Sequence, residues 1–116
     1  MPSKATNKTY SCPVEVTLDV VGGKWKSLIL YHLINRKILR FSEFRKLVPS
    51  VTAQMLAAQL RELEADRIVS RKVYAQVPPK VEYSLTSFGD SLAPIIFAMT
   101  AWGMDYAKTS GSRITL

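Results

Sequence analysis

Two side chains of the sequence are of types that could do covalent or acid–base chemistry, the thiol of Cys12 and the imidazole of His32. Cys12 precedes Pro13 at the expected start of a helix, where the positive helix end and the nearby Lys8 can hold a thiol in its reactive thiolate form. Such a thiolate would react with oxidants or with other thiols; the alternative is a small, inert, partly buried residue. His32 stands in a helical pattern without a companion ligand or nucleophile, which favours a packing role in a partly exposed position.

The sequence offers little to an enzyme or a metalloprotein. One cysteine and one histidine exclude an intramolecular disulfide and leave no ligand set for a structural metal. No carboxylates are paired at a useful spacing, no glycine-rich phosphate loop is present, and a dyad of Cys12 with His32 has no further support. We therefore expect no catalytic activity and no cofactor.

The remaining polar groups that could do chemistry are the hydrogen-bonding side chains of one segment, TAQMLAAQLRELEADR. Its apolar residues recur at the spacing of one helix face: Leu56, Leu60 and Leu63. The other face carries small and polar residues, namely Ala53, Gln54, Ala57, Ala58 and Arg61. Small residues let a helix approach a groove floor closely, and glutamine and arginine can bond to base edges or phosphates. The alternative is an ordinary amphipathic helix whose solvent face consists of good helix formers.

The chain as a whole is basic. Its 116 residues include 16 lysines and arginines against 9 aspartates and glutamates, a net charge of +7, which favours a polyanionic partner, either nucleic acid or an anionic membrane surface. The longest mostly apolar run, residues 92–104, is interrupted by Pro94 and Gly103 and falls short of the ~20 residues that cross a bilayer. The polar N-terminal residues do not resemble a signal peptide, so we expect the protein in the cytoplasm and not in a membrane. The length of the chain suits a single domain.

Three segments precede the predicted helix of residues 52–67. Pro13 and Gly22-Gly23 bound the first, for which helix and strand both stay open because its apolar residues also alternate. Residues 24–37 predict a central core helix with Trp25 inside; Lys24 and Lys26 at its start are either solvated or within reach of a phosphate. Capping residues predict the next two helix starts, at Ser42 for a short helix that buries Phe44, Leu47 and Val48, and at Thr52 for the helix described above.

A two-stranded hairpin is predicted after Asp66. Apolar and polar residues alternate from Val69 to Tyr74 and again from Val81 to Leu85, around a tip stiffened by Pro78 and Pro79. Lys80 at this tip suits a sugar-phosphate backbone, and the alternative is a plain solvated turn. Arg67 stands where a helix end in left-handed geometry would prefer glycine, so either Arg67 is mildly strained or the helix ends in another way.

The last predicted helix begins after Thr86 and is expected to kink at Pro94. Its apolar stripe either folds back on its own core or forms a two-fold interface, and the second is favoured because the other helices already supply apolar faces. The predicted interface residues are Leu92, Ile95, Met99, Trp102 and Tyr106. We thus expect a flexible arm over residues 1–10, one domain over 11–107 and a flexible tail over 108–116.

The chain resembles the HxlR-type winged-helix transcriptional regulators of bacteria, relatives of the MarR group. The motifs that carry the resemblance are CPVEVTLDVVGGKWKSLIL, RFSEFRKLVP, MLAAQLRELEAD, VPPKVEYSLT and the closing AWG, which occur in this order across most of the chain. The resemblance implies a mainly α fold with a small β-hairpin (α+β), a winged helix-turn-helix that dimerises through its terminal helices. It also implies that DNA contacts come from Thr52, Ala53, Gln54, Ala57 and Arg61 on the second helix of the motif and from Arg71, Lys72 and Lys80 on the wing. At Cys12 it permits an oxidant-sensing thiol.

These observations lead to two hypotheses of function. The first is a transcription regulator that binds an inverted repeat in double-stranded DNA as a homodimer and responds to an oxidant or a small-molecule effector. The second is a winged helix that serves as a protein-interaction module, which would lack salt-sensitive affinity for DNA.

Overall fold

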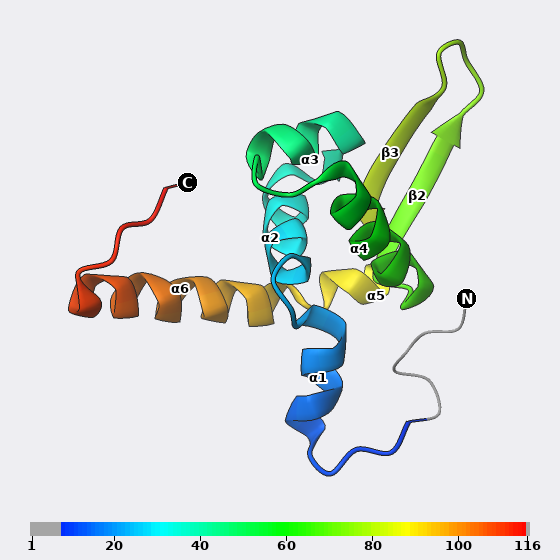
Figure 1. Ribbon diagram of the computed structural model, residues 1–116. Helices are drawn as coiled ribbons and strands as arrows, with labels where there is room; N and C mark the ends of the chain where they lie inside the picture. Colours follow the sequence, from blue (N-terminus) through cyan, green and yellow to red (C-terminus); the bar gives the residue numbers. More distant parts are fainter. Residues whose placement is uncertain (1–7, 116) are drawn as a thin grey trace.

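The computed structural model describes residues 8–115 as a set of helices beside a small antiparallel sheet (Figure 1). The helices are α1 (Pro13–Val21), α2 (Lys26–Arg36), α3 (Phe41–Leu47), α4 (Ala53–Ala65), α5 (Ser87–Asp90) and α6 (Ala93–Ser110). The strands are β1 (Ile38–Leu39), β2 (Val69–Tyr74) and β3 (Lys80–Leu85), in the sheet order β1-β3-β2. This is the predicted α+β winged helix-turn-helix. The first segment is a helix that begins at Pro13 and ends before Gly22, so its open assignment is settled.

α3, the turn after it and α4 form the helix-turn-helix. Thr52 is the N-cap of α4, as predicted, because its hydroxyl accepts a hydrogen bond from the backbone N–H of Met55 at 3.1 Å. The prediction for α3 is wrong: its N-cap is Arg40 and not Ser42. Glu43 explains the difference, since its carboxylate reaches back and accepts a hydrogen bond from the Arg40 N–H at 2.7 Å, which satisfies a donor at the helix start.

The hairpin of β2 and β3 is the wing, which projects from the body beside α4 (Figure 1). Its register pairs Val69 with Leu85, Arg71 with Tyr83 and Tyr74 with Lys80. Alternate residues point to opposite faces of a sheet, so Arg71 shares the inner face with the buried Tyr83. Lys72, Tyr74 and Lys80 lie on the outer face.

The bend between α4 and the wing is formed by Arg67, whose φ of 63° is left-handed. The sequence left open whether Arg67 is mildly strained or the helix ends in another way, and the structure has the strained residue. The backbone N–H of Arg67 bonds to the carbonyl of Glu64 at 3.0 Å, and its carbonyl accepts the Thr86 hydroxyl at 2.7 Å. These bonds hold the bend in place of the glycine that the geometry would prefer.

The core forms around α2, with Trp25 inside as predicted, and includes Phe44, Leu56, Leu60 and Leu63 from the helix-turn-helix. Lys26 departs from expectation. It is neither solvated nor able to reach a phosphate, because only 2% of it is exposed and its ammonium lies 2.7 Å from Glu62 Oε1 on α4. This ion pair joins the start of the core helix to the last turn of α4.

The last helix is not one kinked helix, as predicted, but two. Thr86 caps α5, since its hydroxyl accepts a hydrogen bond from the Gly89 N–H at 2.8 Å, and the chain turns at Ser91 and Leu92 before α6 begins. Pro94 therefore lies in the first turn of α6, where its missing N–H costs nothing, and causes no kink. Leu92 is only 8% exposed and belongs to the core, which removes it from the predicted surface stripe.

The chain ends also differ from the expected boundaries. α6 continues to Ser110, past the predicted start of the tail at residue 108. Residues 1–7 of the predicted arm lie outside the described residues, whereas Tyr10 is held against α1: its hydroxyl donates to Asp19 Oδ2 at 2.6 Å, and Lys8 pairs with the same oxygen at 3.2 Å. Its hydrogen bond to the Asp19 carboxylate is the main cause that raises the pKa of Tyr10 to about 12.

Candidate nucleic-acid interface

The outward side of α4 carries most of the residues predicted to contact DNA. Leu56, Leu60 and Leu63 are buried on one side, which fixes the helix orientation. The N-terminal end is exposed at Thr52, Ala53 and Gln54, and Arg61 is exposed two turns further on, while Ala57 is half-buried. The exposed side of the helix thus has mostly small side chains in its N-terminal half and one long cationic side chain further on.

A depression of about 380 Å³ lies between α4 and the inner face of the wing. It is lined by Ala57, Leu60, Arg61, Glu64, Arg71 and Tyr83. The structure therefore brings together Arg61 and Arg71, which are separated in sequence by the end of α4 and the bend. The sequence reasoning missed Glu64, although its helical spacing from Ala57 and Arg61 places it on the same side of α4.

Lys72 and Lys80 do not join this depression. They lie on the outer face of the wing beside Tyr74, with their ammonium groups 4.9 and 4.8 Å from the centre of its ring. Lys80 also pairs with Glu82 at 3.3 Å. The predicted DNA contacts thus divide into a set around α4, which includes Arg71, and a pair on the far face of the wing.

Cys12 is the N-cap of α1 and its side chain is exposed. The adjacent Ser11 hydroxyl bonds to Glu15 in the first turn of α1, which places a carboxylate near this helix end. No cluster of three or more histidine, cysteine, aspartate or glutamate side chains suited to a metal occurs within residues 8–115. Because its side chain is exposed, Cys12 is accessible to reagents in solution.

His32 is half-buried on α2, where its ring makes an edge-on contact with Tyr31 at a centroid distance of 5.2 Å. Burial and the nearby Arg36 lower its pKa. This matches the predicted packing role in a partly exposed position.

Apolar side chains of α6 remain exposed on its free side, because the helix extends away from the rest of the chain (Figure 1). The predicted interface residues Ile95, Met99, Trp102 and Tyr106 are among them, and Trp102 is 69% exposed. The sequence reasoning missed further exposed apolar residues, Phe97 and Met104 about half a turn from this stripe on α6, and Val14 and Leu18 on α1. Exposed apolar side chains that gather on a helix, as on α6, are typical of an interaction surface.

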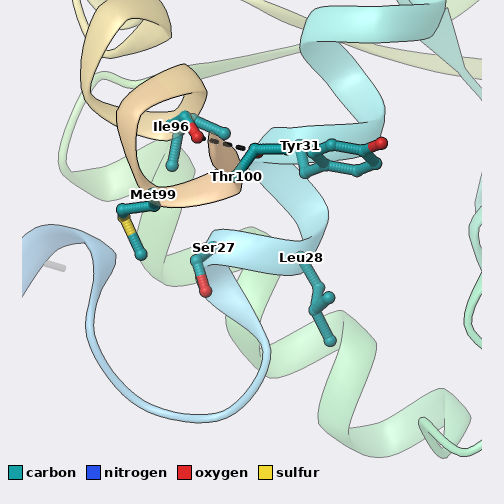
Figure 2. Close-up of a pocket in the computed structure, with 6 residues that line it drawn as sticks. All are labelled: Ser27, Leu28, Tyr31, Ile96, Met99 and Thr100. Atoms are coloured by element: carbon teal, nitrogen blue, oxygen red, sulfur yellow. Dashed lines mark hydrogen bonds between the residues drawn. The ribbon is translucent and has the colours of Figure 1, made fainter. Parts of the chain in front are cut away.

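A small notch lies between α2 and α6 at the edge of this apolar surface (Figure 2). It has a volume of about 170 Å³ and is lined by Ser27, Leu28, Tyr31, Ile96, Met99 and Thr100. The Thr100 hydroxyl donates to the Ile96 carbonyl at 2.8 Å, so this lining presents mainly apolar groups. Ligand pockets usually measure roughly 300–1,000 Å³, so the notch suits a single side chain better than a whole ligand.

A helix-turn-helix whose second helix is exposed, followed by a wing and set in a basic chain, defines a DNA-binding regulator of transcription. The family model described as HxlR-like helix-turn-helix matches residues 20–111. The chain belongs to this family.

Two relatives and one solved structure illustrate the similarity. The HTH-type transcriptional regulators YdeP and YybR of Bacillus subtilis (strain 168) are 62% and 64% identical to the chain over 95 and 92 residues. These matches cover 82% and 79% of this chain and 73% of each relative. The redox regulator HypR in its reduced form shares 57% identity with a TM-score of 0.82, over 88% of this chain and 100% of that one.

These relatives, like YkvN of Bacillus subtilis (strain 168), are described as HTH-type transcriptional regulators. The fold also resembles a MarR-family regulator from Porphyromonas gingivalis W83, with a TM-score of 0.76 and 37% identity over 84% of this chain and 94% of that one. None of the helices within residues 8–115 combines the length and apolarity that a membrane crossing requires.

Proposed function

We propose that the chain regulates transcription as a homodimer bound to an inverted repeat in double-stranded DNA. The depression lined by Arg61 and Arg71, beside the exposed surface of α4, carries the proposal. With α4 in the major groove, Thr52, Ala53 and Gln54 meet the DNA first and Ala57 allows a close approach. The sugar-phosphate strand then passes between α4 and the wing, where Arg71 can reach it, while Arg61 on α4 can reach the base edges.

Binding to the DNA upstream of the protein's own gene and to a scrambled duplex, each at two salt concentrations, tests the proposal. Fluorescence anisotropy should show tighter binding to the upstream duplex and loss of affinity with salt. Arg61→Ala should weaken the upstream duplex more than the scrambled one, because this side chain reaches base edges. Lys80→Ala should weaken both alike and lower the salt slope by at most ~1.

Lys108→Ala is the matched control, since it removes the same charge from an exposed position on α6. Equal losses from all three variants on both duplexes would contradict the division between base and phosphate contacts. If neither duplex binds at low salt, the chain is an interaction module and the DNA-binding proposal is wrong.

The homodimer is supported by the exposed apolar side chains of α6, among them Trp102 at 69% exposure, and by those of α1. A second copy would cover this surface, and one of its side chains would fill the notch beside Met99. Two-fold symmetry places the half-sites about one helical turn apart, ~34 Å, or a multiple of that. Footprinting should reveal two related half-sites, and a single unrepeated site would count against the dimer.

An oxidant is the effector that the chain's own chemistry favours. HypR, the redox regulator to which this chain is similar, has been solved in oxidised and reduced forms, and Cys12 is exposed here. With one cysteine per chain, two thiols must come from two copies or from Cys12 and a small thiol. They form one disulfide, and the two electrons and two protons released reduce the oxidant, for example the azo bond of diamide.

Diamide treatment tests this step. Oxidation should weaken binding to the upstream duplex, reductant should restore it, and Cys12→Ser should bind without responding to diamide. Mass spectrometry of the oxidised protein distinguishes a linked dimer from a mixed disulfide. If diamide leaves the wild-type affinity unchanged, Cys12 does not control binding.

A further inference from the structure

Four side chains form a connected cluster on the outer face of the wing. Lys72, Tyr74, Lys80 and Glu82 share this face because the register pairs Tyr74 with Lys80 and Lys72 with Glu82. The ammonium groups of Lys72 and Lys80 lie 4.9 and 4.8 Å from the centre of the Tyr74 ring, close enough for cation–π attraction to the same ring. Two lysines from different strands are therefore drawn to one aromatic side chain.

Glu82 fixes the ring and one of the lysines. The Tyr74 hydroxyl donates to Glu82 Oε1 at 2.9 Å, and Lys80 pairs with Glu82 Oε2 at 3.3 Å. The Tyr74 hydrogen bond is the main reason that the pKa of Glu82 is lowered; burial opposes this change, and the positive charges of Lys80 and Arg40 support it. Glu82 is thus ionised at neutral pH and accepts both bonds.

The charge of the cluster suits one phosphate group. Two lysines against one glutamate leave one positive charge, at the end of the hairpin that flanks the α4 surface. Free lysine side chains lose rotational freedom when they bind, and this loss weakens binding by roughly two- to tenfold per side chain. A ring that already orders both lysines removes part of that loss before DNA arrives.

We propose that Tyr74 is a positioning residue, whose ring holds Lys72 and Lys80 as a preformed seat for one backbone phosphate of the bound DNA at the outer face of the wing. The inference rests on the proposed DNA binding. It adds a role for Tyr74, which does not itself contact DNA in that proposal. Arg71 is on the opposite face, so the wing offers the backbone positive charge on both of its faces. Tyr74 acts only through the two lysines.

A double-mutant cycle separates this role from a general effect on the wing. Tyr74→Leu removes the ring, Tyr74→Phe keeps the ring and removes the hydroxyl, and Lys72→Ala with Lys80→Ala removes the groups to be positioned. Val73→Ala, on the other face of the same strand, is the matched control. Anisotropy titrations against upstream and scrambled duplexes at several salt concentrations give affinity and salt slope, and circular dichroism verifies that each variant is folded.

Tyr74→Leu should weaken both duplexes about three- to tenfold, while Tyr74→Phe stays within about twofold of wild type and Val73→Ala is unchanged. The double lysine variant should lower the salt slope by ~0.9, as expected for one phosphate. In that background, Tyr74→Leu should have no further effect.

An equal loss from Tyr74→Leu with and without the lysines would overturn the inference, because the tyrosine would then act through the wing fold. Wild-type affinity in Tyr74→Leu would overturn it too. Both results leave the proposed DNA binding intact, which fails only if the wild-type protein shows no salt-sensitive affinity for either duplex.

Discussion

Replacing Thr52 by aspartate should stabilise the fold and weaken DNA binding in the same variant. Thr52 caps α4 with its hydroxyl, 3.1 Å from the Met55 nitrogen, and its extended backbone already has N-cap geometry. Aspartate keeps the acceptor and adds a negative charge at the positive end of the helix. The same exposed position is where α4 would first meet DNA phosphates, which repel that charge.

The expected magnitudes differ for the two properties. A carboxylate at an exposed helix start contributes about 0.3–1 kcal/mol, so the melting temperature should rise by roughly 1–4 °C in a domain of this size. Like charges about 4 Å apart cost from about 1 kcal/mol in water to about 4 kcal/mol near a protein surface, so the Kd for DNA should rise at least about fivefold. Thr52→Ala loses the cap and should cost about 1 kcal/mol of stability.

Thermal melts and anisotropy titrations of Thr52→Asp, Thr52→Ala and Thr52→Ser test both halves of the reasoning. Serine keeps the acceptor without the charge and should match wild type in stability. A lower melting temperature for Thr52→Asp would refute the capping argument. An unchanged Kd for that variant would show that the N-terminal end of α4 does not approach DNA.

Four further variants test other parts of the structure. Trp102→Lys should weaken self-association by about 2 kcal/mol or more while the monomer stays folded, measured by sedimentation equilibrium; an unchanged dimer would place the interface elsewhere. Glu62→Ala, which removes the carboxylate 2.7 Å from the Lys26 ammonium, should cost about 2 kcal/mol in urea unfolding, as for the loss of one charged hydrogen bond. Lys26→Met should cost about 1 kcal/mol, because the Glu62 left behind is 40% exposed; the reverse order would contradict the argument. The pKa of His32 is lowered in the fold, mainly by burial, so the unfolded chain takes up a proton first as pH falls. Its contribution to stability should be present above about pH 6.5 and be lost below it, and His32→Gln should show a smaller loss between pH 7 and 5.5.

The parts of the fold that were predictable from sequence depend on local signals. The capping hydroxyl of Thr52, the apolar spacing of α4 and the alternation of β2 and β3 each involve residues a few positions apart, and the structure has all three. The N-cap of α3 was missed although its signal is also local, because Glu43 bonds back to Arg40 and this competes with Ser42 as a helix start.

Contacts between distant segments were not predictable in the same way. Lys26 follows Trp25 in a polar-looking stretch, and only the packing of α2 on α4 brings Glu62 to 2.7 Å from its ammonium. Leu92 fits the helical stripe of α6 by spacing, but the break between α5 and α6 turns it into the core. In both cases the burial of the residue depends on how separate helices pack, which spacing along the chain does not reveal.

The two faces of the wing are an intermediate case. Tyr83 is buried against Phe44 at a ring distance of 6.0 Å, and this contact fixes which side of β3 faces inward. Residues an odd number of positions from Tyr83 must then face outward, which puts Lys80 and Glu82 on the outer face. Pairing of Tyr74 with Lys80 follows from the same register. A slip of one residue would reverse both faces and expose Tyr83, so the core that buries this tyrosine also determines where the positive charges of the wing are presented.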